Sequence, residues 1–102
     1  MSKLRFTNKA VGDLTSIWNH TERTWSAQQV ERYYNMLMNA CGSLTEPGPN
    51  ICRHYDDIMP GLLGLKTGRH IIFHTISESG DVTIIRILHE RHERMDVRQR
   101  FR

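Results

Sequence analysis

The sequence lacks a long apolar run and has little cysteine. Its 102 residues contain no stretch of about 18 apolar side chains, the length that a membrane-spanning helix requires. The first residues, Met1-Ser2-Lys3-Leu4-Arg5, lack the apolar region of a signal peptide. The two cysteines, Cys41 and Cys52, are too few for a disulfide framework. These absences predict a cytoplasmic protein with reduced cysteines and no membrane partner.

Patterns typical of metal sites are also missing. His70 and His74 are four positions apart on a predicted strand, about 13 Å, which is too far for both to bind one metal ion. The net charge of +3 is mild, without the dense basic and aromatic clusters of charge-driven nucleic-acid binders. We therefore expect no metal, no cofactor and no direct nucleic-acid binding by the protein alone. A solvated basic surface is favoured over a nucleic-acid surface, and a surface for an acidic protein partner fits equally well.

Helical periodicity is clear in the first half of the chain. One helix is predicted over about residues 8–23. Ser26 and Gln29 have the spacing of a capping box, which starts a second helix running to about Leu44. The short connection predicts an antiparallel helical hairpin. The apolar stripe of the second helix is Val30, Tyr33, Tyr34, Leu37, Met38, Cys41 and Leu44.

Alternating and apolar segments predict the strands. A short strand covers residues 3–7, and three more follow the loop that ends at Pro60-Gly61: 62–66, 69–76 and 82–89. Residues 93–100 are expected to form a short helix or to remain mobile. One strand, two helices and a three-stranded meander predict a single α+β domain over residues 1–102, with a basic tail over about 90–102.

Arg86 interrupts an otherwise apolar strand. A guanidinium there is costly unless it finds a partner, which leaves two interpretations. In one, Arg86 pairs with a carboxylate of the chain, such as Asp96; in the other, it faces a groove that receives an acidic partner, and the two are compatible. The two helices can cover only one face of the sheet, so the opposite apolar face is a second predicted partner site.

Several segments, in this order, are similar to one known family. They are Asp13-Leu14, Ile17-Trp18, Gly68-Arg69-His70-Ile71-Ile72-Phe73, Ile84-Ile85-Arg86-Ile87-Leu88-His89 and Arg94-Met95-Asp96. Over nearly its whole length the chain resembles the ParE toxins of the RelE/ParE superfamily of bacterial toxin–antitoxin modules. The resemblance implies a β-α-α-β-β-β fold, with a twisted antiparallel sheet packed on a helical hairpin. It implies that the free protein inhibits DNA gyrase, stalling it on cleaved DNA. It also implies a ParD-like antitoxin that wraps the toxin in a hetero-oligomer and represses the operon.

Two departures from the family pattern leave alternatives open. Five residues separate His89 from Met95, where the family usually has two, and Leu62 and Leu63 stand where it often has tyrosine and arginine. An inactive relative that only binds antitoxin is therefore one alternative. A ribosome-dependent mRNA endoribonuclease of the RelE type is the other. Its basic and acid–base groups would come from Lys66, Arg69, His70, His74, Arg86 and His89.

The resemblance favours binding over bond-making, so we expect no catalytic residue and no enzyme activity. The basic tail is either a frayed charged terminus or a contact region for gyrase. The residues expected to contact gyrase or the antitoxin are Lys66, Arg69, Arg86, His89, Arg91, Arg94, Met95 and Arg98.

Overall fold

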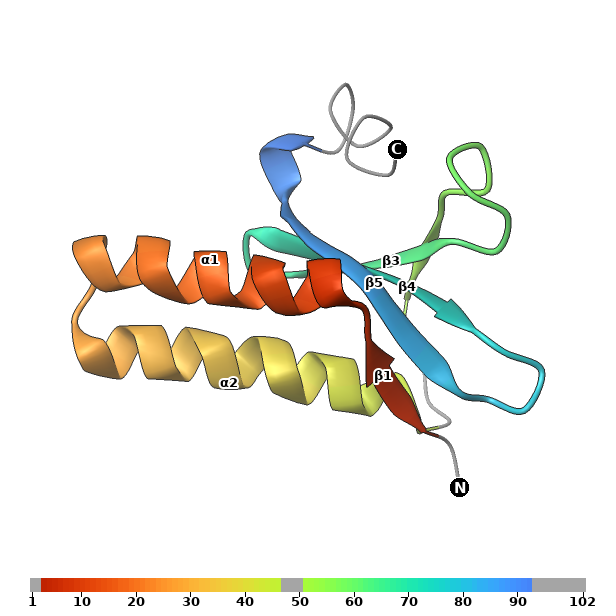
Figure 1. The fold of residues 1–102 in the computed structure, drawn as a ribbon, viewed down its shortest axis with the longest axis horizontal. Coiled ribbons are helices and arrows are strands. Elements are labelled where there is room, and N and C mark those ends of the chain that lie inside the picture. The colour runs from red at the N-terminus through yellow and green to blue at the C-terminus, as the bar shows by residue number, and fades with distance from the viewer. Residues whose placement is uncertain (1–2, 47–50, 93–102) are drawn as a thin grey trace.

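In the computed structural model, residues 3–46 and 51–92 are described, and they form a helical hairpin packed on a five-stranded sheet (Figure 1). This arrangement confirms the predicted α+β class. It also confirms the predicted order of elements, apart from an additional strand of two residues. The segment predicted as a short helix over 93–100 lies outside the described residues. The elements are β1 (Leu4–Phe6), α1 (Asn8–Thr24), α2 (Ala27–Ser43), β2 (Arg53–His54), β3 (Leu63–Thr67), β4 (His70–Ile76), β5 (Val82–His89) and a 3₁₀ turn (Glu90–His92).

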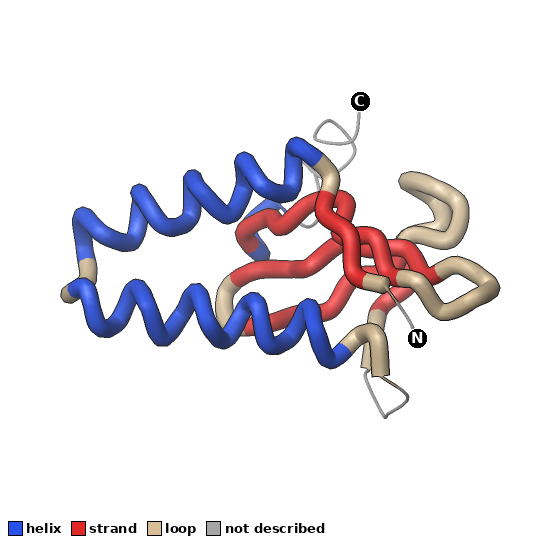
Figure 2. Tube along the Cα trace, turned by 60° about the horizontal axis from the view of Figure 1, so that its bottom comes forward, coloured by secondary structure: helices blue, strands red, loops and turns tan. Residues whose placement is uncertain are grey.

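Side-chain caps fix where both helices begin. The Thr7 hydroxyl accepts a hydrogen bond from the backbone N–H of Ala10, which satisfies one free donor of the first turn of α1. At the start of α2, Ser26 and Gln29 form the predicted capping box, with bonds of 3.3 and 3.2 Å. Trp25 and Ser26 alone separate the helices, so α1 and α2 run antiparallel side by side (Figure 2).

The sheet has the order β1-β5-β4-β3-β2 and is mixed. Strands β3, β4 and β5 form the predicted antiparallel meander. The edge strand β1 instead pairs parallel with β5, in a register that sets Leu4 opposite Val82 and Phe6 opposite Ile84. The family resemblance implied an antiparallel sheet, and the parallel pair of β1 and β5 is the one departure from it among the described strands. A parallel pair is possible here because the whole chain between the two strands serves as the crossover connection.

The main core lies between the hairpin and the sheet. Apolar side chains of both helices pack on the inward residues of β4 and β5. Cys41 is fully buried in this core, as predicted, and both cysteines are free thiols. The buried members are Ala10, Leu14, Ile17, Leu37, Cys41, Leu44, Ile72, Val82, Ile84 and Ile87. Burial of these residues holds the helices on one face of the sheet.

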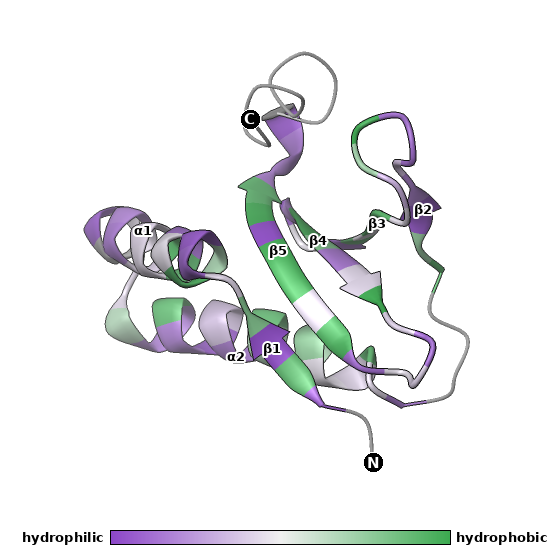
Figure 3. Cartoon of the chain, turned by 45° about the vertical axis from the view of Figure 1, so that its right-hand side comes forward, coloured by the Kyte–Doolittle hydropathy of each residue, from purple (hydrophilic) through white to green (hydrophobic). Residues whose placement is uncertain are grey.

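A second core closes the opposite face, which contradicts the prediction of an open apolar surface. The chain between β2 and β3 folds back, and its buried Tyr55 and Leu62 pack on Phe73 and two further strand residues, Ile71 and Leu88. The rings of Tyr55 and Phe73 meet edge to face at 5.0 Å. Figure 3 shows the apolar colour along β5 and in part of the returning loop.

Local hydrogen bonds hold this loop in place. The N–H of Tyr55 donates to the carbonyl of Leu62 at 2.9 Å, and Asp56 accepts from the N–H of Gly61 at 3.0 Å. Gly64 in β3 lets the Tyr55 ring approach, since a Cβ at that position would lie 2.7 Å from the ring. The sequence prediction failed here because the apolar residues of this loop follow neither helical nor strand spacing.

Candidate functional site

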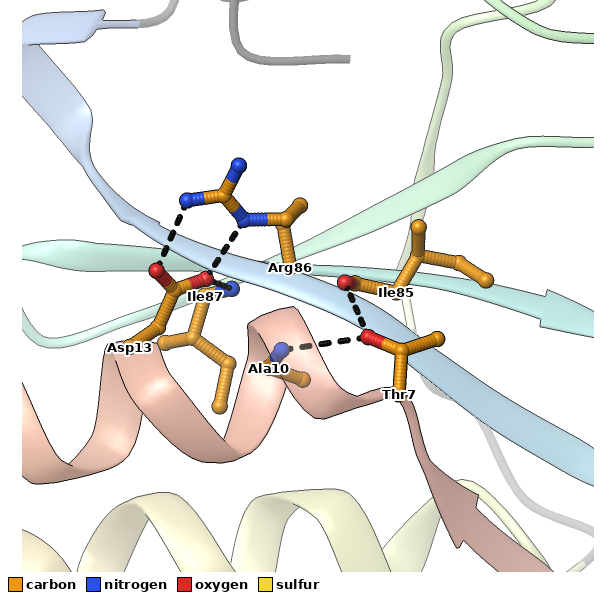
Figure 4. A network of polar contacts seen from close by, with 6 residues as sticks. All are labelled: Thr7, Ala10, Asp13, Ile85, Arg86 and Ile87. Carbon is orange, nitrogen blue, oxygen red and sulfur yellow. Dashed lines mark hydrogen bonds and ion pairs between the residues drawn. The ribbon is translucent and has the colours of Figure 1, made fainter. Parts of the chain in front are cut away.

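Arg86 forms a two-bonded ion pair with Asp13 of α1 (Figure 4). Its Nε and Nη2 donate to the two carboxylate oxygens, each at 2.8 Å, and the side chains are 13% and 14% exposed. The hydrogen bonds to Asp13 raise the pKa of Arg86, so the guanidinium is charged at any ordinary pH. Asp13 and Arg86 therefore tie the first helix to the last strand.

A β-bulge creates the space for this pair. Phe73 pairs with Arg86, but the next residue, His74, pairs with Ile84, so Ile85 is an extra residue in β5. Side chains at and near the start of α1 hydrogen-bond to backbone groups of β5 beside the bulge. Asp13 accepts from the N–H of Ile87 at 3.0 Å, and Thr7 donates to the carbonyl of Ile85 at 2.7 Å.

The side chain of Arg86 does not face an open groove, since it is only 13% exposed, and its contact with gyrase or the antitoxin stays a prediction. The alternative, an arginine paired within the chain, is correct, but with Asp13 rather than Asp96, which lies outside the described residues. No sequence pattern indicates Asp13 as the partner, because it is 73 positions from Arg86 and the pairing depends on the bulge. Because the guanidinium of Arg86 is already neutralised by Asp13, it is poorly placed to stabilise charge on a substrate.

A cavity of about 330 Å³ opens where β4 begins and β5 ends. Its walls come from the second half of α1, the tip of the hairpin, the turn between β3 and β4, and the end of β5. The lining residues are Ser16, Ile17, His20, Thr21, Thr24, Trp25, Tyr33, Arg69, His70, His89 and Arg91. Three predicted contact residues, Arg69, His89 and Arg91, are therefore brought together here.

Hydrogen bonds order the floor of the cavity. The backbone N–H of Arg69 donates to the Tyr33 hydroxyl at 3.1 Å, and this hydroxyl lies 2.6 Å from Nδ1 of His70. The hydroxyl therefore links the turn at Arg69 to the ring of His70. Gly68 turns the chain at this point with a φ of +60°, and a Cβ there would lie 2.9 Å from Tyr33. The rings of His70 and His89 meet edge to face at 5.3 Å.

The other predicted residues that the structure describes, Lys66, His74 and Arg86, do not line the cavity. Lys66 forms an ion pair of 3.1 Å with Glu90, and this contact lowers the pKa of Glu90. His74 is fully buried, where it donates from Nδ1 to the carbonyl of Ile72 and lies 3.8 Å from the thiol of Cys52. Arg94, Met95 and Arg98 are outside the described residues. The six ribonuclease candidates therefore do not converge on one site.

Sequence reasoning missed Trp25, Tyr33 and His20 as site residues. The two aromatics were assigned to the core because they lie on or beside the helical stripes, yet Trp25 is 38% exposed. Among the described residues, no three histidine, cysteine or acidic side chains are grouped so as to hold a metal ion. In the same part of the chain, neither helix is long and apolar enough to cross a membrane.

The neutral state of His70 predicts a loss of stability in acid. Burial, followed by the electrostatic effect of the neighbouring His89, lowers the pKa of His70 from 6.5 to about 4. Between these pH values the unfolded chain binds a proton that the folded protein does not, so stability is full above pH 6.5 and falls as the pH drops towards 4. We expect a loss of about 1–2 kcal/mol, reduced from the full shift by partial solvent exposure.

Urea unfolding of wild type and His70→Asn at neutral and mildly acidic pH measures this loss. The variant should be less stable than wild type at neutral pH and should lose less stability on acidification. His54→Asn on the exposed β2 serves as the control, with a pH dependence like that of wild type. Equal acid sensitivity of His70→Asn and wild type would contradict the assignment.

Comparisons with known proteins agree with this fold. The family model described as ParE toxin of type II toxin-antitoxin system, parDE, matches residues 4–94. Toxin ParE1 of Mycobacterium tuberculosis is 34% identical over 88 residues, which is 86% of each chain. Toxin ParE1 of Caulobacter vibrioides is 27% identical over 90 residues, 88% of this chain and 91% of the relative.

A solved structure has the same fold. It is described as the chromosomal ParDE TA system from P. aeruginosa, and the matching chain superposes with a TM-score of 0.67 at 18% identity. The match covers 87% of this chain and 96% of that one. By the extent of the family match and the identity of its relatives, the chain belongs to the ParE toxin family of type II toxin–antitoxin systems.

Proposed function

We propose that this toxin inhibits DNA gyrase and is neutralised by a ParD-like antitoxin, with residues 1–102 acting as one toxin domain in the cytoplasm. The observation that carries the proposal is the gathering of Arg69, Arg91 and exposed aromatic surface around one cavity, in a chain of the ParE family. Exposed arginine and tryptophan are the side chains that most often dominate protein interfaces. In this proposal the basic tail over about 90–102 adds further cationic contacts.

The geometry favours binding over phosphodiester cleavage. General acid–base chemistry on RNA needs two groups on either side of a phosphate, with cations beside it. His70 and His89 are in direct ring contact, which leaves no room for a phosphate between them. Arg86 is held by Asp13, and His74 is buried away from the cavity. These positions do not support the alternative of a RelE-type endoribonuclease.

The alternative of an inactive relative depends in part on Leu62. Leu62, one of the two departures from the family pattern, is buried in the second core and presents nothing to a partner. The leucine at this position therefore contributes to packing and not to a partner contact. Growth of a host that expresses the chain without antitoxin would favour this alternative.

The purified chain is expected to inhibit gyrase supercoiling and to accumulate cleaved DNA. Replacing both Arg94 and Arg98 with glutamine should weaken inhibition by about tenfold, since cationic contacts speed association and add to affinity. Arg5→Gln, on the exposed edge of β1, is the matched control and should leave inhibition unchanged. The measurement is a supercoiling and cleavage titration at fixed salt. An absence of cleaved DNA at micromolar protein would contradict the proposed target.

A further inference from the structure

A second hollow adjoins the cavity at the tip of the hairpin. It measures about 280 Å³ and is lined by Trp25, Gln29, Arg32, Tyr33 and Met36. Trp25 and Tyr33 line both hollows, and their rings meet edge to face at 5.4 Å. The two rings therefore form one aromatic wall with a hollow on each side.

This surface is unusually apolar for the outside of the molecule. Trp25 is 38% exposed and Met36 37% exposed, and these are two of the five large apolar side chains exposed in the described part of the chain. In contrast to the far face of the sheet, no described segment folds over them. Exposed apolar side chains gathered at a hollow are typical of a protein-binding surface.

The charge around the wall has one sign. The described residues lining the two hollows include Arg32, Arg69 and Arg91, all exposed, and no carboxylate. Glu90, beside the cavity, is engaged by Lys66. Because the chain has a net charge of +3, a second copy would meet like charge here, whereas an acidic segment would meet opposite charge.

We propose that the two hollows are the docking site of an acidic peptide segment, which places one apolar side chain on each side of the Trp25–Tyr33 wall and pairs its carboxylates with Arg32, Arg69 and Arg91. The inference rests on the proposed function, because the segment would belong to the antitoxin. The hollows select the apolar side chains, and the arginines select the acidic residues between them.

Fluorescence anisotropy with labelled synthetic peptides tests this site in the full chain. The first peptide is rich in glutamate and carries two leucines one helical turn apart. The second has glutamine in place of every glutamate, and the third has alanine in place of both leucines. The first should bind at least about tenfold more tightly than either of the others. Equal binding of all three, or no binding of the first, overturns the proposal.

Two variants locate the binding. Ser16→Phe fills the larger hollow from an exposed helical position at little cost in helix propensity, and Arg69→Glu reverses one charge. Each should weaken the first peptide about tenfold or more. The matched controls are Asn35→Phe on the exposed surface of α2 and Arg5→Glu on β1, which should bind like wild type. Circular dichroism establishes that all four are folded. Unchanged binding by Ser16→Phe overturns the site.

Two further results separate this inference from the proposed function. Peptide binding without any effect on gyrase removes gyrase as the target and leaves the docking site in place. Gyrase inhibition without peptide binding overturns the docking site alone. A third result would also overturn the proposal. If the protein binds no peptide but sediments as a dimer that Ser16→Phe disrupts, the occupant of the hollows is a second copy of the chain.

Discussion

Asp13→Ala is expected to destabilise the fold by about 3–5 kcal/mol, because it leaves a largely buried guanidinium without its partner. Arg86 is only 13% exposed, so water cannot fully replace the lost carboxylate. The same substitution removes the acceptor for the N–H of Ile87. Since the free energy of unfolding of small domains is only about 5–15 kcal/mol, this one change should remove a large fraction of it.

Urea unfolding of three variants measures the effect. Asp13→Ala should lower the transition midpoint at an unchanged slope. The double variant Asp13→Leu, Arg86→Met removes both charges and should recover much of the loss, as apolar replacements of buried pairs commonly do. Glu78→Ala, which removes a carboxylate from the exposed loop 77–81, is the control and should change little. A cost below about 1 kcal/mol for Asp13→Ala would show that the pair is effectively solvated.

Leu62→Ala is expected to cost about 2–5 kcal/mol, the usual range for emptying a fully buried leucine site. Leu62 has no exposed surface and packs with Tyr55 and Phe73 in the second core. The loop that carries Leu62 cannot collapse freely into the space, because its ends are fixed by β2 and β3. The cost should therefore lie towards the upper part of the range.

The neighbouring leucine provides the comparison. Leu63 begins β3 and is only partly buried, so Leu63→Ala should cost clearly less than Leu62→Ala under the same conditions. A dye that binds exposed apolar surface should respond to Leu62→Ala more than to Leu63→Ala. Equal costs for the two variants would mean that the loop does not seal this face of the sheet.

The sequence was sufficient where structure depends on local pattern. The spacing of Ser26 and Gln29 located the start of α2, and the apolar run from Val82 to His89 gave the bounds of β5. It was insufficient where structure depends on register. Phe73 and His74 flank a bulge that no local pattern signals, and that bulge decides which acid Arg86 meets.

The candidate site was predicted only in part, for the same reason. Arg69, His89 and Arg91 were chosen for their chemistry, and the register of β4 with β5 then sets His70 opposite His89. Tyr33 was assigned to the core by its helical spacing, but its hydroxyl reaches His70 and its ring forms part of an exposed wall. Residues that are half core and half surface are poorly distinguished by periodicity alone.

The pairing of β1 with β5 has a consequence for biosynthesis. The first strand of the chain can complete the sheet only after Val82–His89 has left the ribosome. The helical hairpin can form earlier from contacts near in sequence, whereas the sheet closes through the distant pairing of Leu4–Phe6 with β5. The native sheet can therefore form only after β5 has been synthesised, later than the helical hairpin.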